Sequence, residues 1–135
     1  MTARRVASAL GGALCLVAVW SLAGSASAGD KPPTTVGVRN GASEFSFTLS
    51  RTKVKPGPAI IQYQNTGEDP HDVKILRRGA RRELAIGVTE PGLTGSVTIE
   101  RLKPESKYDL WCSLEGHREA GMEATLKVAK KKRKR

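Results

Sequence analysis

The segment from Tyr108 to Val128 reads YDLWCSLEGHREAGMEATLKV. Apolar side chains alternate with other residues on both sides of a glycine-containing loop, 113–121. They are Tyr108, Leu110 and Cys112 before the loop and Met122, Ala124, Leu126 and Val128 after it. Alternation with a period of two is typical of a strand with one buried face. The segment therefore predicts two strands that are joined by a loop and that face one common core.

The same alternation recurs upstream, between turns that contain Gly or Pro. It predicts strands at 44–49, 59–65, 71–76, 83–88 and around Val97 and Ile99. Parity places Phe45 on the same face as Phe47, and Val88 on the same face as Ile86. Short strands between Gly and Pro turns predict an all-β protein, an antiparallel Greek-key β-sandwich or barrel.

The N-terminus differs in composition from the rest of the chain. Two arginines precede an apolar run from Val6 to Leu22, and small residues follow at Ala26-Ser27-Ala28. This order is typical of a secretory signal peptide that is cleaved before Gly29. An uncleaved membrane anchor is the alternative, although the apolar run is short for a membrane span. We expect export to the periplasm, the cell envelope or the extracellular space.

The remaining chain divides into a domain at 29–129 and a basic tail at 130–135. The formal charge of the whole chain is +10, and all six residues of the tail are Lys or Arg. We expect the tail to be disordered and to contact anionic membrane or envelope polymers. Because so much of the basicity lies in this tail, and because export is expected, we expect no nucleic-acid partner.

Four potential soft metal ligands, with nitrogen or sulfur donors, follow residue 28: His71, Cys112, His117 and Met122. A single thiol in an exported protein suggests an intermolecular disulfide, a reactive thiol or a metal ligand. The spacing C-x4-H-x4-M lets one loop present three of these side chains, and His71 begins a neighbouring predicted strand. Two imidazoles, a thiolate and a thioether form the donor set of a blue-copper site. Zinc also accepts two His and a Cys, but it normally takes a hard ligand, a thiolate or water as the fourth.

Residues 34–129 resemble the cupredoxins, the family of plastocyanin and azurin. The resemblance is carried by Asn65-x-Gly67…Pro70-His71-Asp72-Val73 and by Tyr108-x-Leu110-Trp111-Cys112-Ser113-x4-His117-x4-Met122. It implies that His71, Cys112, His117 and Met122 are the ligands of one type 1 copper ion. Asp72 is a departure, since the family often has Asn there. Asp72 can accept a hydrogen bond from Ser113 but offers no amide donor, and its charge would favour Cu(II).

Two functions are compatible with this site. The first is a carrier of single electrons between redox partner proteins, and the second is a copper-binding module for storage, delivery or resistance. Four protein ligands leave no open position for a substrate, so we expect no enzyme activity. We expect a monomer, with Trp111 either a half-buried strand residue or an exposed ring that assists electron entry. The basic connection 77–82 is either a solvated turn or a docking element for an acidic redox partner.

Overall fold

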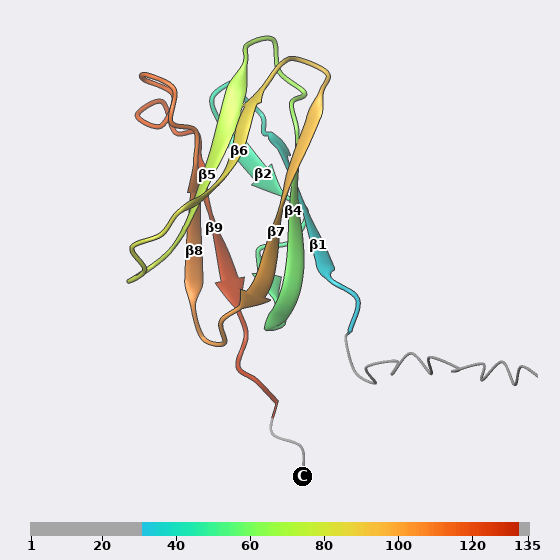
Figure 1. The fold of residues 1–135 in the computed structure, drawn as a ribbon. Coiled ribbons are helices and arrows are strands. Elements are labelled where there is room, and N and C mark those ends of the chain that lie inside the picture. Colours follow the sequence, from blue (N-terminus) through green and yellow to red (C-terminus); the bar gives the residue numbers. More distant parts are fainter. Residues whose placement is uncertain (1–30, 133–135) are drawn as a thin grey trace, which may run out of the picture.

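The computed structural model describes residues 31–132, which form two packed β-sheets and contain no helix (Figure 1). The four-stranded sheet has the order β2-β1-β4-β7 and comprises β1 (Thr34–Asn40), β2 (Phe47–Leu49), β4 (Gly57–Gln64) and β7 (Thr94–Leu102). The five-stranded sheet has the order β3-β9-β8-β5-β6 and comprises β3 (Lys53–Val54), β5 (His71–Arg77), β6 (Leu84–Thr89), β8 (Lys107–Trp111) and β9 (Glu123–Val128). The predicted all-β sandwich is confirmed.

Strand direction is mixed. Among the described residues, β1 runs parallel to β4 and β3 runs parallel to β9, while the other pairs are antiparallel. Hairpin connections impose antiparallel pairing, whereas strands that are distant in sequence can pair in either direction. Each parallel pair joins strands that are distant in sequence, so alternation alone could not reveal its direction.

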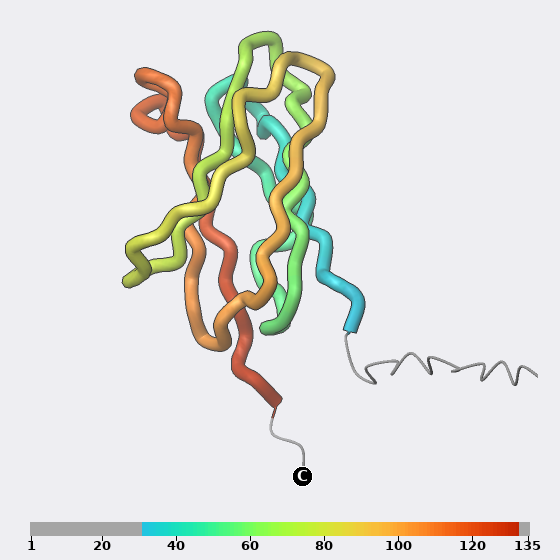
Figure 2. The backbone as a smooth tube through the Cα atoms, viewed as in Figure 1, coloured from blue at the N-terminus to red at the C-terminus, as the bar shows by residue number. Residues whose placement is uncertain are grey.

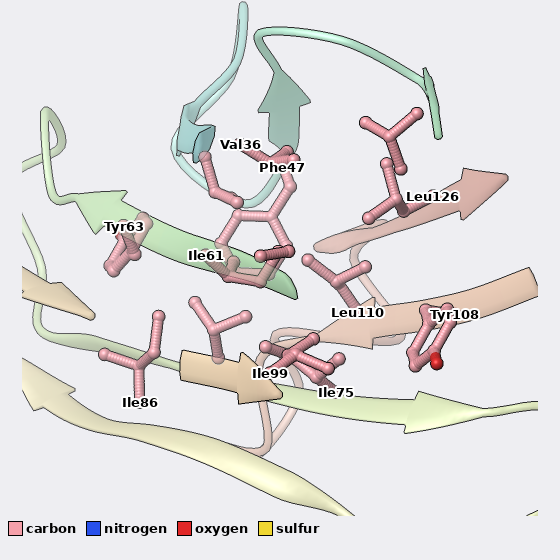
Figure 3. Packing of buried hydrophobic residues seen from close by; sticks show 14 of the residues in the cluster. Val36, Phe47, Ile61, Tyr63, Ile75, Ile86, Ile99, Tyr108, Leu110 and Leu126 are labelled. Atoms are coloured by element: carbon pink, nitrogen blue, oxygen red, sulfur yellow. The ribbon is translucent and has the colours of Figure 1, made fainter. Parts of the chain in front are cut away.

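Buried side chains from both sheets meet between the layers (Figure 3). Val36 and Ile61 project from the four-stranded sheet, and Ile75 and Leu110 from the five-stranded sheet; all four are at most 2% exposed. Removing such a side chain from water stabilises the fold by about 1.5–3 kcal/mol. The core therefore fixes the strand registers that carry the candidate site at one end of the sandwich.

The predicted strand membership of Phe45 and the predicted buried face of Val88 are wrong, although Phe45 does pack against the core. Phe45 lies in the loop before β2, which begins only at Phe47, because Gly41 N–H donates to the Ser46 carbonyl (2.9 Å) and closes a turn there. Val88 is 59% exposed, although Ile86 is buried. The β5–β6 register shifts between the pairs Val73–Ile86 and His71–Thr89. Such an irregularity inserts an extra residue into β6 and turns Val88 outward.

The predicted signal peptide, 1–28, and the last residues of the tail, 133–135, lie outside the described residues. Within 31–132, no helix is long and apolar enough to span a membrane.

Candidate metal centre

Strand register brings the predicted ligands together. β8 runs antiparallel to β5 with Trp111 opposite Lys74, so the end of β8 lies beside the beginning of β5 and its first residue, His71. On the other side, Trp111 pairs with Glu123 of β9, and Cys112 N–H donates to the Met122 carbonyl (3.0 Å). Cys112, directly after β8, is therefore flanked by His71 at the start of β5 and by Met122 directly before β9, as the sequence predicted.

The loop from Ser113 to Gly121 directs His117 toward the same point. His117 N–H donates to the Leu114 carbonyl (3.1 Å), and the His117 carbonyl accepts from Met122 N–H (3.0 Å). The turn needs the left-handed backbone of Gly116 (φ 78°) and Gly121 (φ 105°), a conformation that glycine adopts without a steric cost. The two glycines thus allow a short loop to return His117 over the end of the sheet.

Three donor atoms form a compact triangle. His71 Nδ1 lies 3.0 Å from His117 Nδ1, and Cys112 Sγ lies 4.0 Å and 3.5 Å from these two nitrogens. A circle through atoms at these separations has a radius of about 2.1 Å, close to the roughly 2.0–2.3 Å of metal–nitrogen and metal–sulfur bonds to a divalent ion. The triangle therefore fits a single metal ion.

The four residues differ in their access to solvent. His71, Cys112 and Met122 have no exposed surface, whereas His117 is partly exposed. Met122 lies directly before β9 and is held from both sides by its backbone bonds to Cys112 and His117. The predicted set is thus assembled at one end of the sandwich, and His117 is the member that reaches the surface.

The Cys112 thiol lies between opposing influences. Burial raises its pKa and the nearby Asp72 carboxylate adds to the rise, while the backbone N–H groups of Asp72 and Leu114 oppose it. A metal ligand must be the thiolate, which these N–H groups stabilise. The sulfur is therefore placed where a cation would complete its stabilisation.

Glu44 contacts the candidate site, although no pattern in the sequence indicated it. Its Oε1 atom lies 2.6 Å from His71 Nε2 and also accepts the backbone N–H groups of Glu68 and Asp69, both at 3.1 Å. These hydrogen bonds, that from His71 first, hold the pKa of Glu44 below its ordinary value. When Nε2–H donates to this carboxylate, the Nδ1 lone pair of His71 points toward the metal position.

The loop that receives Glu44 is itself tightly held. Buried Asn65 donates to the carbonyls of Asp69 and Thr89, both at 2.8 Å, and accepts the Gly67 N–H at 2.9 Å. A Cβ atom at position 67 would overlap the Glu44 carboxylate, so a larger residue there would displace this carboxylate. The Asn-x-Gly motif seen in the sequence therefore builds the cradle of Glu44.

Phe45 packs its ring against both imidazoles. The centroid of the Phe45 ring lies 4.8 Å from the centroid of His117 and 6.2 Å from that of His71, in edge-to-face geometry. Aromatic contacts of this kind fix ring orientation. The loop before β2 thus supplies both a hydrogen-bond acceptor and an apolar wall to the site.

Asp72 ties the two ligand-bearing segments together, as the sequence allowed. Its carboxylate accepts the Ser113 N–H at 2.6 Å and the Ser113 hydroxyl. Asp72 is 6% exposed and follows His71, while Ser113 follows Cys112. A buried carboxylate therefore bridges the residues next to two of the donors.

Of the other residues discussed from the sequence, Trp111 lies beside the site, whereas the basic connection 77–82 lies away from it. Trp111 is half-buried, and the Arg118 guanidinium lies 4.7 Å from its ring centroid. The basic connection 77–82 lies at the opposite end of β5 from His71, about 20 Å along the strand. Arg78 of this connection binds Asp109 with two hydrogen bonds, 2.8 and 2.9 Å.

Solved structures with the same architecture include three of interest. Auracyanin B superposes with a TM-score of 0.58 at 22% identity, covering 75% of this chain and 92% of its own. Auracyanin A from Chloroflexus aurantiacus gives 0.57 at 15%, covering 72% and 99%. Rusticyanin from Thiobacillus ferrooxidans gives 0.51 at 17%, covering 70% and 75%. No protein-family model matches the chain, and no curated sequence matches it. The chain therefore shares the cupredoxin fold that its sequence resembled.

Proposed function

We propose that the chain is a blue copper protein that carries single electrons, with one type 1 copper ion held by His71, Cys112, His117 and Met122. The observation that carries the proposal is the triangle of two imidazole nitrogens and one sulfur, with Met122 beside it. Auracyanin A, which shares the fold, is described as a blue copper protein. Bound copper supplies a one-electron couple between Cu(I) and Cu(II).

The surrounding residues keep the donors in place. Glu44 holds the His71 ring, Phe45 packs on both imidazoles, and Asp72 joins the segments that carry His71 and Cys112. A site held from outside needs little rearrangement when its charge changes by one unit, which favours fast electron transfer. His117 is the partly exposed ligand and supplies the shortest path to a partner.

We further propose that the protein is exported through the signal peptide at 1–28 and meets its redox partners as a monomer. Four protein donors leave no open coordination position, so we expect no substrate turnover. An acidic partner that binds the 77–82 hairpin would dock at the far end of β5 from His71. Such contacts would steer the encounter, while electron transfer itself would use the surface around His117.

Protein-film voltammetry, together with competition against a Cu(I) chelator, tests the electron-carrier role. A carrier gives a reversible one-electron wave and keeps its copper in the presence of the chelator in both oxidation states. An irreversible wave with rapid loss of copper to the chelator would contradict this role and would support copper storage or delivery instead.

A further inference from the structure

A concave basic surface lies at the end of the sandwich opposite the candidate metal centre. The cavity has a volume of about 1060 Å³, and seven of its eleven lining residues are Lys or Arg. Lys31, Lys55, Arg101, Lys103 and the segment 130–132 contribute these cations, and all of them are exposed. No carboxylate lines the cavity within the described chain, and Lys130 is paired with Glu105 beside it at 3.3 Å. We call this set of seven residues the basic end.

The fold places these cations together from four separate segments. They lie before β1, in the β3–β4 turn, near the end of β7 and after β9. Figure 2 shows that the first and last described residues also lie at this end of the sandwich. Ala129 N–H donates to the Val54 carbonyl (2.8 Å), and the Ala129 carbonyl accepts from Glu105 N–H (3.3 Å). These two bonds fix the direction in which the tail leaves the domain.

The opposite end of the molecule carries the opposite charge. The four loops around the candidate metal centre, 41–46, 65–70, 90–93 and 113–121, hold six carboxylates and a single cation, Arg118. That cation is paired with Glu123 at 3.3 Å. The molecule is therefore electrically polarised along its long axis, and a negatively charged surface attracts the basic end and repels the loops around His117.

The composition of the basic end favours a diffuse anionic surface over a defined small ligand. Six of its seven cations are lysines, which act as hydrated point charges and lack the bidentate geometry of arginine. In addition, three more cations, 133–135, follow Lys132 in the sequence. A cluster of Lys and Arg side chains at one end of a domain is typical of attachment to an anionic lipid bilayer.

We propose that the basic end docks the protein on a bilayer that contains anionic phospholipid and holds the candidate metal centre away from the lipid. The tail supplies part of the charge, and the folded residues Lys55, Arg101 and Lys103 supply a fixed part that sets the orientation. The proposal is independent of the identity of the metal, because it rests only on the charges at the two ends.

Vesicle co-sedimentation tests the docking surface. The probes are phosphatidylcholine vesicles with and without phosphatidylglycerol, and the protein is purified after export with its N-terminus read by mass spectrometry. The triple variant Lys55→Gln/Arg101→Gln/Lys103→Gln should bind the anionic vesicles about a hundredfold more weakly, since each cation near such a surface contributes roughly fivefold. The matched control Arg77→Gln/Arg81→Gln/Arg82→Gln removes the same charge from the β5–β6 hairpin and should retain binding within a few-fold.

Equal weakening in both triple variants would overturn the proposal, because net charge alone would then decide binding. Equal binding to both kinds of vesicle would also overturn it, because an apolar segment would then suffice. Circular dichroism and the unfolding midpoint confirm that both surface variants are folded.

Tryptophan fluorescence tests the orientation. The chain contains Trp20 and Trp111, and the proposed cleavage before Gly29 removes Trp20 on export. Where mass spectrometry shows that the N-terminus is retained, Trp20→Phe serves instead, so that Trp111, beside Cys112, is the single reporter. With brominated anionic lipid, Trp111 should remain unquenched while the protein is bound. Strong quenching of Trp111 would place the metal end against the membrane and would overturn the proposed orientation.

Discussion

Replacing Glu44 with Gln should raise the reduction potential of the copper-loaded protein. The carboxylate accepts from His71 Nε2 at 2.6 Å and two backbone N–H groups hold it in place. A negative charge behind a ligand stabilises the more positive, oxidised metal. Gln keeps the size and one acceptor oxygen of Glu but removes the charge, so the oxidised state loses this stabilisation.

The size of the effect follows from distance. One imidazole ring and one hydrogen bond separate the carboxylate from the centre of the donor triangle, roughly 6.5 Å. One unit of charge at that distance contributes about 0.6 kcal/mol in water and about 2.5 kcal/mol at an effective dielectric constant of about 20. Since a tenfold change in equilibrium corresponds to about 59 mV for one electron, the expected increase is roughly 30–110 mV.

Voltammetry of wild type, Glu44→Gln and a control measures this shift. Glu68→Gln is the matched control, because it removes the same charge from the same loop cluster, but its side chain is exposed and only its backbone contacts Glu44. Solvent screening should keep the shift of the control well below that of Glu44→Gln. An unchanged potential in Glu44→Gln, or equal shifts in the two variants, would refute a specific role for Glu44.

Three further changes test the scaffold. Gly67→Ala should displace the Glu44 carboxylate and raise the reduction potential in the same direction as Glu44→Gln, and a potential equal to that of wild type would show that the cradle is not required. Leu110→Ala removes a fully buried side chain and should lower the free energy of unfolding by about 2–5 kcal/mol in urea titrations; a loss below about 1 kcal/mol would mean that the core does not pack around Leu110. The hydrogen bonds from Arg78 lower the pKa of Asp109, so the stability they give is present above the ordinary carboxyl pKa and is lost as pH falls through the lowered value. Asp109→Asn should therefore lower the thermal unfolding midpoint at neutral pH and have no effect in strong acid, and an effect independent of pH would exclude this linkage.

The convergence of the ligands could be predicted from sequence because it depends on local rules. A period of two, continued by one residue beyond β8 and before β9, places Cys112 and Met122 on the buried side, and the loop between them is too short to take His117 far away. His71 begins a strand that pairs next to β8. Alternation and loop length therefore sufficed for this part of the site.

The roles of Glu44 and Phe45 could not be predicted in the same way. Alternation extended a strand through these residues, whereas the chain turns there and sends both side chains toward His71. The partners of Glu44 lie more than twenty positions away in sequence, and no motif near residue 44 indicates these contacts. Contacts of this kind depend on how loops meet in three dimensions.

The directions of the strand pairs and the bulge in β6 also depend on contacts that form only in the folded structure. The strand TTVGVRN at 34–40 lacks a strong alternation and was not predicted. Val36 and Val38 are nevertheless buried in it, and residues 34–39 pair parallel to β4. The shift that exposes Val88 appears only when β6 pairs with β5. The pairing between strands therefore determined the direction of β1 and the side on which Val88 lies, which the alternation of apolar residues could not predict.

The most direct test of the central proposal is the visible absorption spectrum after loading with one equivalent of Cu(II). Wild type should become intensely coloured through charge transfer from the Cys112 thiolate to copper, and Cys112→Ser should lose that colour while the β-sheet circular dichroism is retained. A wild-type protein that stays colourless, or a Cys112→Ser variant that keeps the same absorption, would contradict a blue copper site formed by His71, Cys112, His117 and Met122.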